Sequence, residues 1–125
     1  MILHLTTCQA DNTHAVTAVV AGYLAQRLGQ EVHFVINTPW QERLRQVIDG
    51  QIQMGWICGY PYVQETAVPN PAFQLLALPV MAGARYQNQP IYFSDVVLRR
   101  DSPYATFTDL RGAAWAYNEV GSQSG

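Results

Sequence analysis

Lysine is absent from this 125-residue sequence, and its seven basic residues are all arginine. A P-loop lysine and a Schiff-base lysine are therefore excluded within this chain. Charged residues make up only 13% of the sequence and the net charge is −2, so the basic footprint of a nucleic-acid or anionic-membrane binder is missing. No apolar run is long enough to cross a bilayer, because Arg, Gln or Asp interrupts each one.

A secretory signal is also missing at the start of the sequence, where residues 1–4 lack a basic region and a full apolar core. A cytoplasmic protein and the mature portion of an exported protein both stay open on this evidence.

Cysteine is scarce, since Cys8 and Cys58 are the only two. Their spacing is not that of metal ligands, and the number of cysteines alone does not show whether they are oxidised. The simplest interpretation is that both are small buried apolar residues. None of the three histidines shares ligand spacing with a carboxylate, so we expect neither a metal nor another cofactor.

Apolar residues are abundant at 49% of the sequence, which is ample for the packed core of one domain. Short β-leaning segments alternate with segments of helical periodicity in the first half. Strands are predicted at 2–7, 31–36 and 51–58, and helices at 14–28, 38–50 and 59–67. This order predicts an α/β fold with a doubly wound, mainly parallel sheet.

The helix boundaries carry recognisable signals. Asp11, Asn12 or Thr13 can cap the helix over 14–28, and Gly29 is placed to end it. Apolar residues recur along this helix at spacings of three and four, which predicts an amphipathic face made of Val16, Val19, Val20, Tyr23, Leu24 and Leu28. The next helix has Thr38 as its expected N-cap, with a capping box completed by Gln41.

The pattern changes in the second half of the chain. Two strands are predicted at 73–80 and 90–99 with no helix between them, and a short helical turn is predicted at 108–112. A small and aromatic run at 113–118 indicates a buried strand, followed by a Gly/Ser turn at 119–125. Such a turn before a helix collects free N–H groups that favour an anion. The sequence is therefore expected to be the front part of a longer chain.

Ligands of open parallel sheets bind beyond the carboxyl ends of the strands. The residues expected there are rich in hydroxyls and aromatic rings and poor in titratable groups, which suits recognition better than general acid–base catalysis. An enzyme would use Cys8 or Ser124 as a nucleophile, with a histidine base among His4, His14 and His33. Gly-x-Ser-x-Gly is absent, and we expect no catalysis.

Four ordered blocks of the sequence, at 55–63, 76–80, 92–102 and 109–125, resemble the phosphate/phosphite/phosphonate-type substrate-binding proteins of ABC transporters. The resemblance implies a type II periplasmic-binding-protein fold, in which two lobes close over a small ligand. It also implies a periplasmic or extracytoplasmic location and an ABC permease as partner.

By this resemblance, residues 1–93 form lobe one without its C-terminal return, residues 94–111 form the crossover or hinge, and residues 112–125 begin lobe two. Such a fragment would leave apolar edges uncovered, so a homodimer or strand exchange is expected.

The ligand-binding positions that the resemblance implies are Trp40, Tyr60, Ser94, Ser122, Gln123 and Ser124. Gln123 stands where the family usually has Thr. Asp95 and Glu119 add negative charge near the expected oxyanion, which favours a zwitterion or an aminoalkyl phosphonate over bare phosphate.

Two alternatives to a transport protein share the same fold. One is a ligand-sensing regulatory domain, and the other, less favoured, is an enzyme acting on a similar small molecule.

Overall fold

The computed structural model describes residues 2–122 and divides the chain into two compact units, Met1–Leu75 and Leu76–Gly125. Each unit is described by itself. Within residues 2–122, no helix combines the length and the apolar character needed to cross a bilayer.

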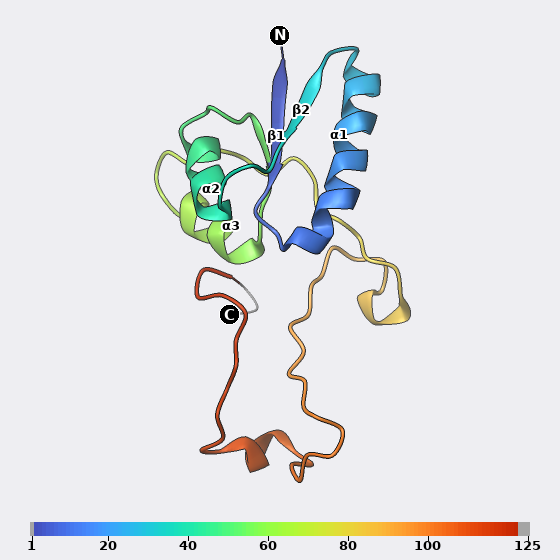
Figure 1. Cartoon of the computed structure of the whole chain (residues 1–125), viewed down its shortest axis with the longest axis vertical. Coiled ribbons are helices and arrows are strands. Elements are labelled where there is room, and N and C mark those ends of the chain that lie inside the picture. The colour runs from blue at the N-terminus through green and yellow to red at the C-terminus, as the bar shows by residue number, and fades with distance from the viewer. Residues whose placement is uncertain (1, 123–125) are drawn as a thin grey trace. The chain divides into compact units, whose positions relative to one another are not determined.

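The first unit is built on a parallel sheet of three strands, β1 (Leu3–Thr7), β2 (Val32–Val35) and β3 (Met54–Trp56). Their order is β2-β1-β3, with β1 in the centre (Figure 1). The strands predicted at 2–7, 31–36 and 51–58 are confirmed. β2 lies at an edge of the sheet, and no residue in it is fully buried.

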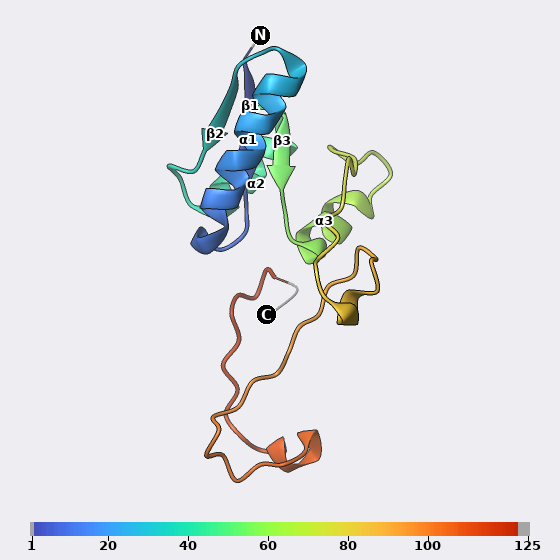
Figure 2. The same ribbon diagram turned by 90° about the vertical axis from the view of Figure 1, so that its right-hand side faces the viewer.

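Three helices alternate with the strands, α1 (His14–Leu28), α2 (Trp40–Ile48) and α3 (Gly59–Thr66). α1 packs on β1 and β2, whereas α2 packs on β1 and β3. The two helices cover opposite faces of the sheet, as Figures 1 and 2 show from two sides. The predicted α/β, doubly wound order is therefore confirmed.

The helix ends agree with the predictions only in part. Gly29 ends α1 in the left-handed region at φ 63°, where a Cβ would be strained. Thr13 is the N-cap of α1 but makes no capping bond, since its hydroxyl donates to the Ala10 carbonyl at 2.8 Å. The capping box predicted from Thr38 is wrong, because α2 starts one residue later, at Trp40, with Pro39 as its uncapped N-cap.

The core of the first unit is small and contains hydroxyls. Its buried apolar residues are Leu5, Ala21, Val47 and Ile52, and three threonines, Thr6, Thr7 and Thr17, are fully buried. The apolar face predicted for α1 is partly wrong, because four of its residues are exposed: Val16, Val19, Tyr23 and Leu28. α1 instead turns Thr17 and Ala21 inward. The narrow sheet therefore leaves most of the large apolar side chains of α1 uncovered.

The second unit has little regular structure in its described part. Two 3-10 turns occur, η2 (Ala84–Tyr86) and η3 (Phe107–Leu110), and η3 confirms the helical turn predicted at 108–112. A capping box between Thr106 and Asp109 starts η3. The strands predicted at 73–80, 90–99 and 113–118 are wrong, because none of these residues pairs in a sheet. A strand needs a hydrogen-bonded neighbour, and periodicity cannot supply one.

Candidate functional site

The carboxyl ends of β2, β1 and β3 meet at one edge of the sheet because the three strands are parallel. The segments that leave this edge lead into α1, α2 and α3. Free N–H groups and the positive ends of the helix dipoles therefore gather beyond β1, which is favourable for an anion. We call this region the carboxyl edge and define it as residues 7–14, 36–40 and 57–60.

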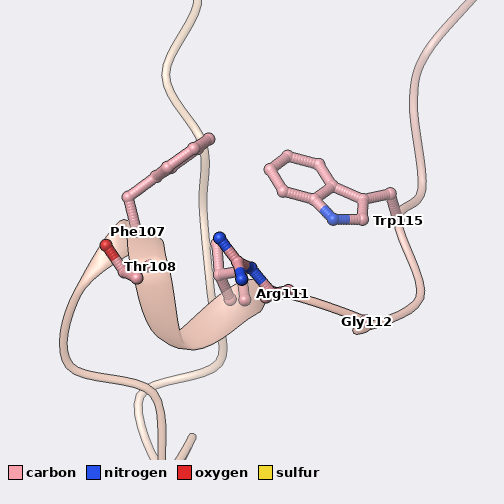
Figure 3. Close-up of a pocket in the computed structure, with 6 residues that line it drawn as sticks. Phe107, Thr108, Arg111, Gly112 and Trp115 are labelled. Atoms are coloured by element: carbon pink, nitrogen blue, oxygen red, sulfur yellow. The ribbon is translucent and has the colours of Figure 1, made fainter.

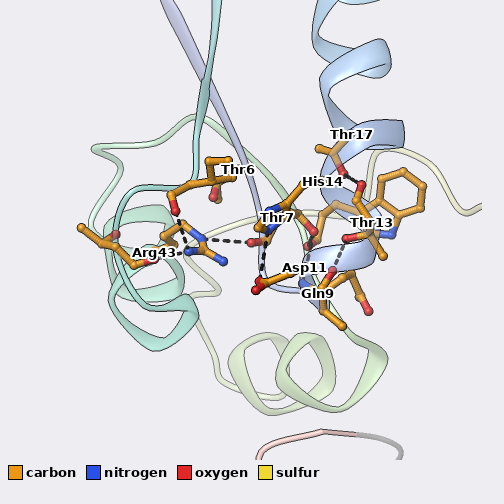
Figure 4. Close-up of polar contacts among 12 residues, drawn as sticks. Thr6, Thr7, Gln9, Asp11, Thr13, His14, Thr17 and Arg43 are labelled. Carbon is orange, nitrogen blue, oxygen red and sulfur yellow. Dashed lines mark hydrogen bonds and ion pairs between the residues drawn. The ribbon is translucent and has the colours of Figure 1, made fainter.

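Two buried threonines of β1 join the strand ends at the carboxyl edge. The Thr6 hydroxyl donates to the Val35 carbonyl of β2 at 2.6 Å, and the Thr7 hydroxyl donates to the Trp56 carbonyl of β3 at 3.4 Å. Thr7 Oγ1 also accepts from the Gln9 amide at 3.1 Å (Figure 4). These bonds satisfy hydroxyls that would otherwise be costly to bury.

Arg43 of α2 is the main feature of the carboxyl edge that the sequence interpretation missed. Its side chain is only 4% exposed. Nε donates to the Thr7 carbonyl at 3.0 Å, and Nη1 donates to the Ile36 carbonyl at 3.4 Å and to the Thr38 carbonyl (Figure 4). One guanidinium thus holds the end of β1 and the loop after β2. Its spacing could have indicated this position in the sequence: Arg43 lies three residues after Trp40 and four before Val47, on the inward face of α2.

Arg43 has no acidic partner among the described residues. No carboxylate within residues 2–122 forms an ion pair with it, and its hydrogen bonds to carbonyl oxygens use Nε and Nη1. A positive charge surrounded by carbonyl dipoles therefore lies beside the carboxyl edge. It adds to the attraction that the helix N-termini exert on an anion.

Trp40 and Tyr60 both lie at the carboxyl edge, on the two sides of β1. Trp40 is the first residue of α2 and is half-buried; its carbonyl accepts from the Cys8 thiol at 3.7 Å. Tyr60 is near the start of α3 and is 44% exposed, and its hydroxyl accepts from Gln64 Nε2 at 3.1 Å. The sheet topology therefore brings these two predicted site residues to one edge of the sheet.

The remaining predicted site residues belong to the second unit. Ser94 is exposed and Ser122 is half-buried. Gln123 and Ser124 lie outside the described residues. The roles of these four residues in ligand binding stay predictions.

One known family matches the chain. It is described as ABC transporter, phosphonate, periplasmic substrate-binding protein, and the match covers residues 3–125. The chain belongs to this family. No curated protein and no solved structure matches it.

Membership among the phosphonate-type periplasmic substrate-binding proteins confirms the predicted resemblance, and the parallel α/β unit is consistent with a lobe of the type II fold. Proteins of this family bind a substrate for an ABC transporter. The proteins of this family are periplasmic. Membership in the family therefore gives this chain the general role of a substrate-binding component.

Cys8 has the wrong chemistry for the nucleophile of the enzyme alternative. Burial raises the pKa of its thiol to about 11, against the opposing effect of the Arg43 charge. A thiol of this kind is protonated at neutral pH and therefore a poor nucleophile. The candidate bases have other neighbours: the rings of His4 and His33 are 5.7 Å apart, and His14 lies edge-on to Phe34 at 6.0 Å.

A hollow of about 380 Å³ in the second unit contains none of the predicted site residues. Figure 3 shows the Arg111 side chain beside the rings of Phe107 and Trp115, which meet edge to face with their centroids 5.8 Å apart. The other lining residues are Thr108, Leu110 and Gly112. Among residues 2–122, no group of three His, Cys, Asp or Glu side chains is arranged to hold a metal ion.

Proposed function

We propose that this protein binds a small phosphonate-like or other oxyanion-containing ligand and delivers it to an ABC permease from an extracytoplasmic compartment. Family membership over residues 3–125 supports the transport role. The cleft between two lobes and the identity of the ligand belong to this proposal.

The observation that carries the proposal is the carboxyl edge with the positive charge of Arg43 beside it. Arg43 is buried there without a carboxylate partner in the described residues, and three helices begin at the same edge. An oxyanion gains from both features, because N–H dipoles and a guanidinium favour negative charge. Oriented N–H groups and hydroxyls also bind without providing a general base, which favours binding over turnover.

In the proposed complex, Trp40 and Tyr60 line the ligand from lobe one. Tyr60 is 44% exposed and Trp40 is half-buried, and aromatic rings exclude water beside a short alkyl chain. Ser94, Ser122, Gln123 and Ser124 supply hydrogen bonds, as the family resemblance implies. Gln123 keeps a side-chain donor where the family usually has Thr.

Isothermal titration calorimetry on the full-length protein tests the proposal. The probes are methylphosphonate, 2-aminoethylphosphonate and inorganic phosphate, with a neutral alcohol as the negative probe. We expect at least one oxyanion to bind without being consumed. No binding of any oxyanion would overturn the proposed ligand class, and product formation would favour the enzyme alternative.

The variant Ser124→Ala tests one proposed contact in the same experiment. Loss of a hydroxyl that donates to a charged oxygen should weaken binding by ~1–3 kcal/mol with little effect on folding. Ser102→Ala is the matched control, because the Ser102 hydroxyl accepts from the Tyr104 amide at 3.3 Å and is not a proposed contact. An unchanged dissociation constant in Ser124→Ala would remove Ser124 from the site.

A further inference from the structure

Arg85 forms a two-bond ion pair with Asp95 in the second unit. Nη1 donates to Oδ2 at 3.1 Å, and Nη2 donates to Oδ1 at 2.9 Å. Arg85 belongs to η2, ten residues before Asp95, so the pair fastens this turn to the segment at 90–99. Two parallel bonds fix the relative orientation of the groups, which a single ion pair does not.

The same guanidinium also stacks on an aromatic ring. The central carbon of Arg85 lies 4.2 Å from the ring centroid of Phe93 and 5.7 Å from that of Tyr86. The rings of Tyr86 and Phe93 are 5.6 Å apart. Arg85 is therefore held by a cation–π contact to Phe93 and by two hydrogen bonds to Asp95.

These two partners are the residues on either side of Ser94. Phe93 and Asp95 both contact Arg85, so Ser94 lies between two neighbours that the same side chain holds in place. Arg85 consequently sets the direction in which Ser94 is presented.

The pair also changes the electrostatics around Ser94. The hydrogen bonds from Arg85, together with its charge, hold the pKa of the Asp95 carboxyl below its ordinary value. Asp95 is therefore ionised with a counter-charge already in place. A carboxylate neutralised by a neighbour repels an incoming oxyanion less than a bare one, and it also attracts a ligand ammonium group less strongly.

We propose that Arg85 is a positioning residue of the ligand site: it orients Ser94 through Phe93 and Asp95, and it shields the ligand from the charge of Asp95. The proposal rests on the proposed function, in which Ser94 contacts the ligand. It also corrects the expectation that Asp95 calls for a zwitterionic ligand. Asp95 has its cation within the protein, so a phosphonate without an amine is accepted at this position.

Calorimetry with methylphosphonate and 2-aminoethylphosphonate on the full-length protein tests this role. We expect Arg85→Met to weaken methylphosphonate binding about threefold to tenfold, because the Asp95 charge is then unpaired. The double variant Arg85→Met/Asp95→Asn should regain part of that loss, since the unpaired charge is gone. A purely structural role of Arg85 would give no such recovery.

The control is Arg99→Met, which removes a comparable exposed ion pair, with Asp101 at 2.7 Å, from the same segment. It should leave both affinities unchanged. Exposed ion pairs contribute little to stability, so Arg85→Met should fold, as thermal melting will check. Arg85→Gln is the second variant if it does not.

Three results would overturn the proposal: unchanged methylphosphonate binding in Arg85→Met, a double variant that binds no tighter than Arg85→Met, or an Asp95→Asn variant that weakens only the aminophosphonate. If the wild-type protein binds neither probe, the proposed function fails and this proposal fails with it. Wild-type binding with an unaffected Arg85→Met overturns the positioning role alone.

Discussion

Cys8 shows how one buried group reports on its surroundings. Its thiol lies where β1 ends, with Arg43 the nearest charge that acts on it. Burial disfavours the thiolate, and the positive charge of Arg43 favours it; burial has the larger effect, so the pKa rises from 9.0 to about 11. The reactivity of the thiol therefore reports on the burial of Cys8 and on the charge of Arg43.

We predict slow alkylation of Cys8 by iodoacetamide at neutral pH in a Cys58→Ser variant, with the rate reaching its half-maximum near pH 11. Arg43→Met should move this midpoint higher, since the lowering effect of the charge is lost. The urea-unfolded chain is the control and should show a midpoint near the ordinary value. A folded-state midpoint at or below pH 9 would contradict the burial of this thiol.

The raised pKa also fixes the sign of a stability effect. The folded state retains the Cys8 proton between pH 9 and about 11, whereas the unfolded state releases it. Stability falls with pH wherever the folded state binds more protons. This contribution is therefore complete below pH 9 and is lost as the pH rises toward 11.

At the scale of elements, Arg43 couples a helix to two strand ends. α2 supplies the guanidinium, and the acceptors are the carbonyls of Thr7 after β1 and of Ile36 and Thr38 after β2. Buried carbonyls that lose such a donor keep their desolvation cost. The contact thus stabilises the arrangement of the loops around the proposed ligand as well as the fold.

We predict that Arg43→Met lowers the free energy of unfolding by ~2–4 kcal/mol, because three carbonyls in buried or partly buried contacts lose a charged donor. Urea denaturation followed by circular dichroism measures the change. Arg45→Met is the matched control on the same helix, since Arg45 is exposed and pairs only with Glu42 at 2.9 Å; it should cost under ~0.5 kcal/mol. If both variants lower the free energy of unfolding equally, the hydrogen bonds of Arg43 do not stabilise the fold.

The elements of the first unit could be predicted because their signals are local. Periodicity and Gly29 gave α1 its bounds, and the turn from β3 into α3 was visible at Gly59. The segments at 73–80 and 90–99 have the composition of strands, but pairing partners are non-local and the described structure gives them none. Composition alone therefore overestimated the sheet.

The sequence could predict the site residues whose position follows from the order of the strands. It could not predict a contact that depends on backbone carbonyl groups. Trp40 and Tyr60 follow strand ends, so the parallel order alone placed them at one edge. The carbonyls that receive Arg43 have no signature in the sequence, because every residue carries one. The sequence interpretation considered only the negative charge of Asp95. The effect of that charge on a ligand depends on Arg85, which pairs with Asp95 from ten residues away.

At the scale of the whole molecule, family membership and the exposed surface have to be considered together. The chain belongs to the phosphonate-type substrate-binding proteins. Its second unit nonetheless leaves large apolar side chains in water, among them Val97 at 84%, Leu76 at 74% and Val120 at 73% exposure. Large apolar side chains left in water favour association.

We predict that the 125-residue chain self-associates as its concentration rises, as sedimentation velocity would measure. Because the driving force is apolar, added sodium sulfate should strengthen the association, whereas association through ion pairs would weaken in salt. Val97→Ser combined with Val120→Ser should reduce it, and Arg100→Ser, which removes an exposed charge from the same unit, should not. A monomer at every concentration, or association that sulfate weakens, would show that this apolar surface forms no interface between copies of the chain.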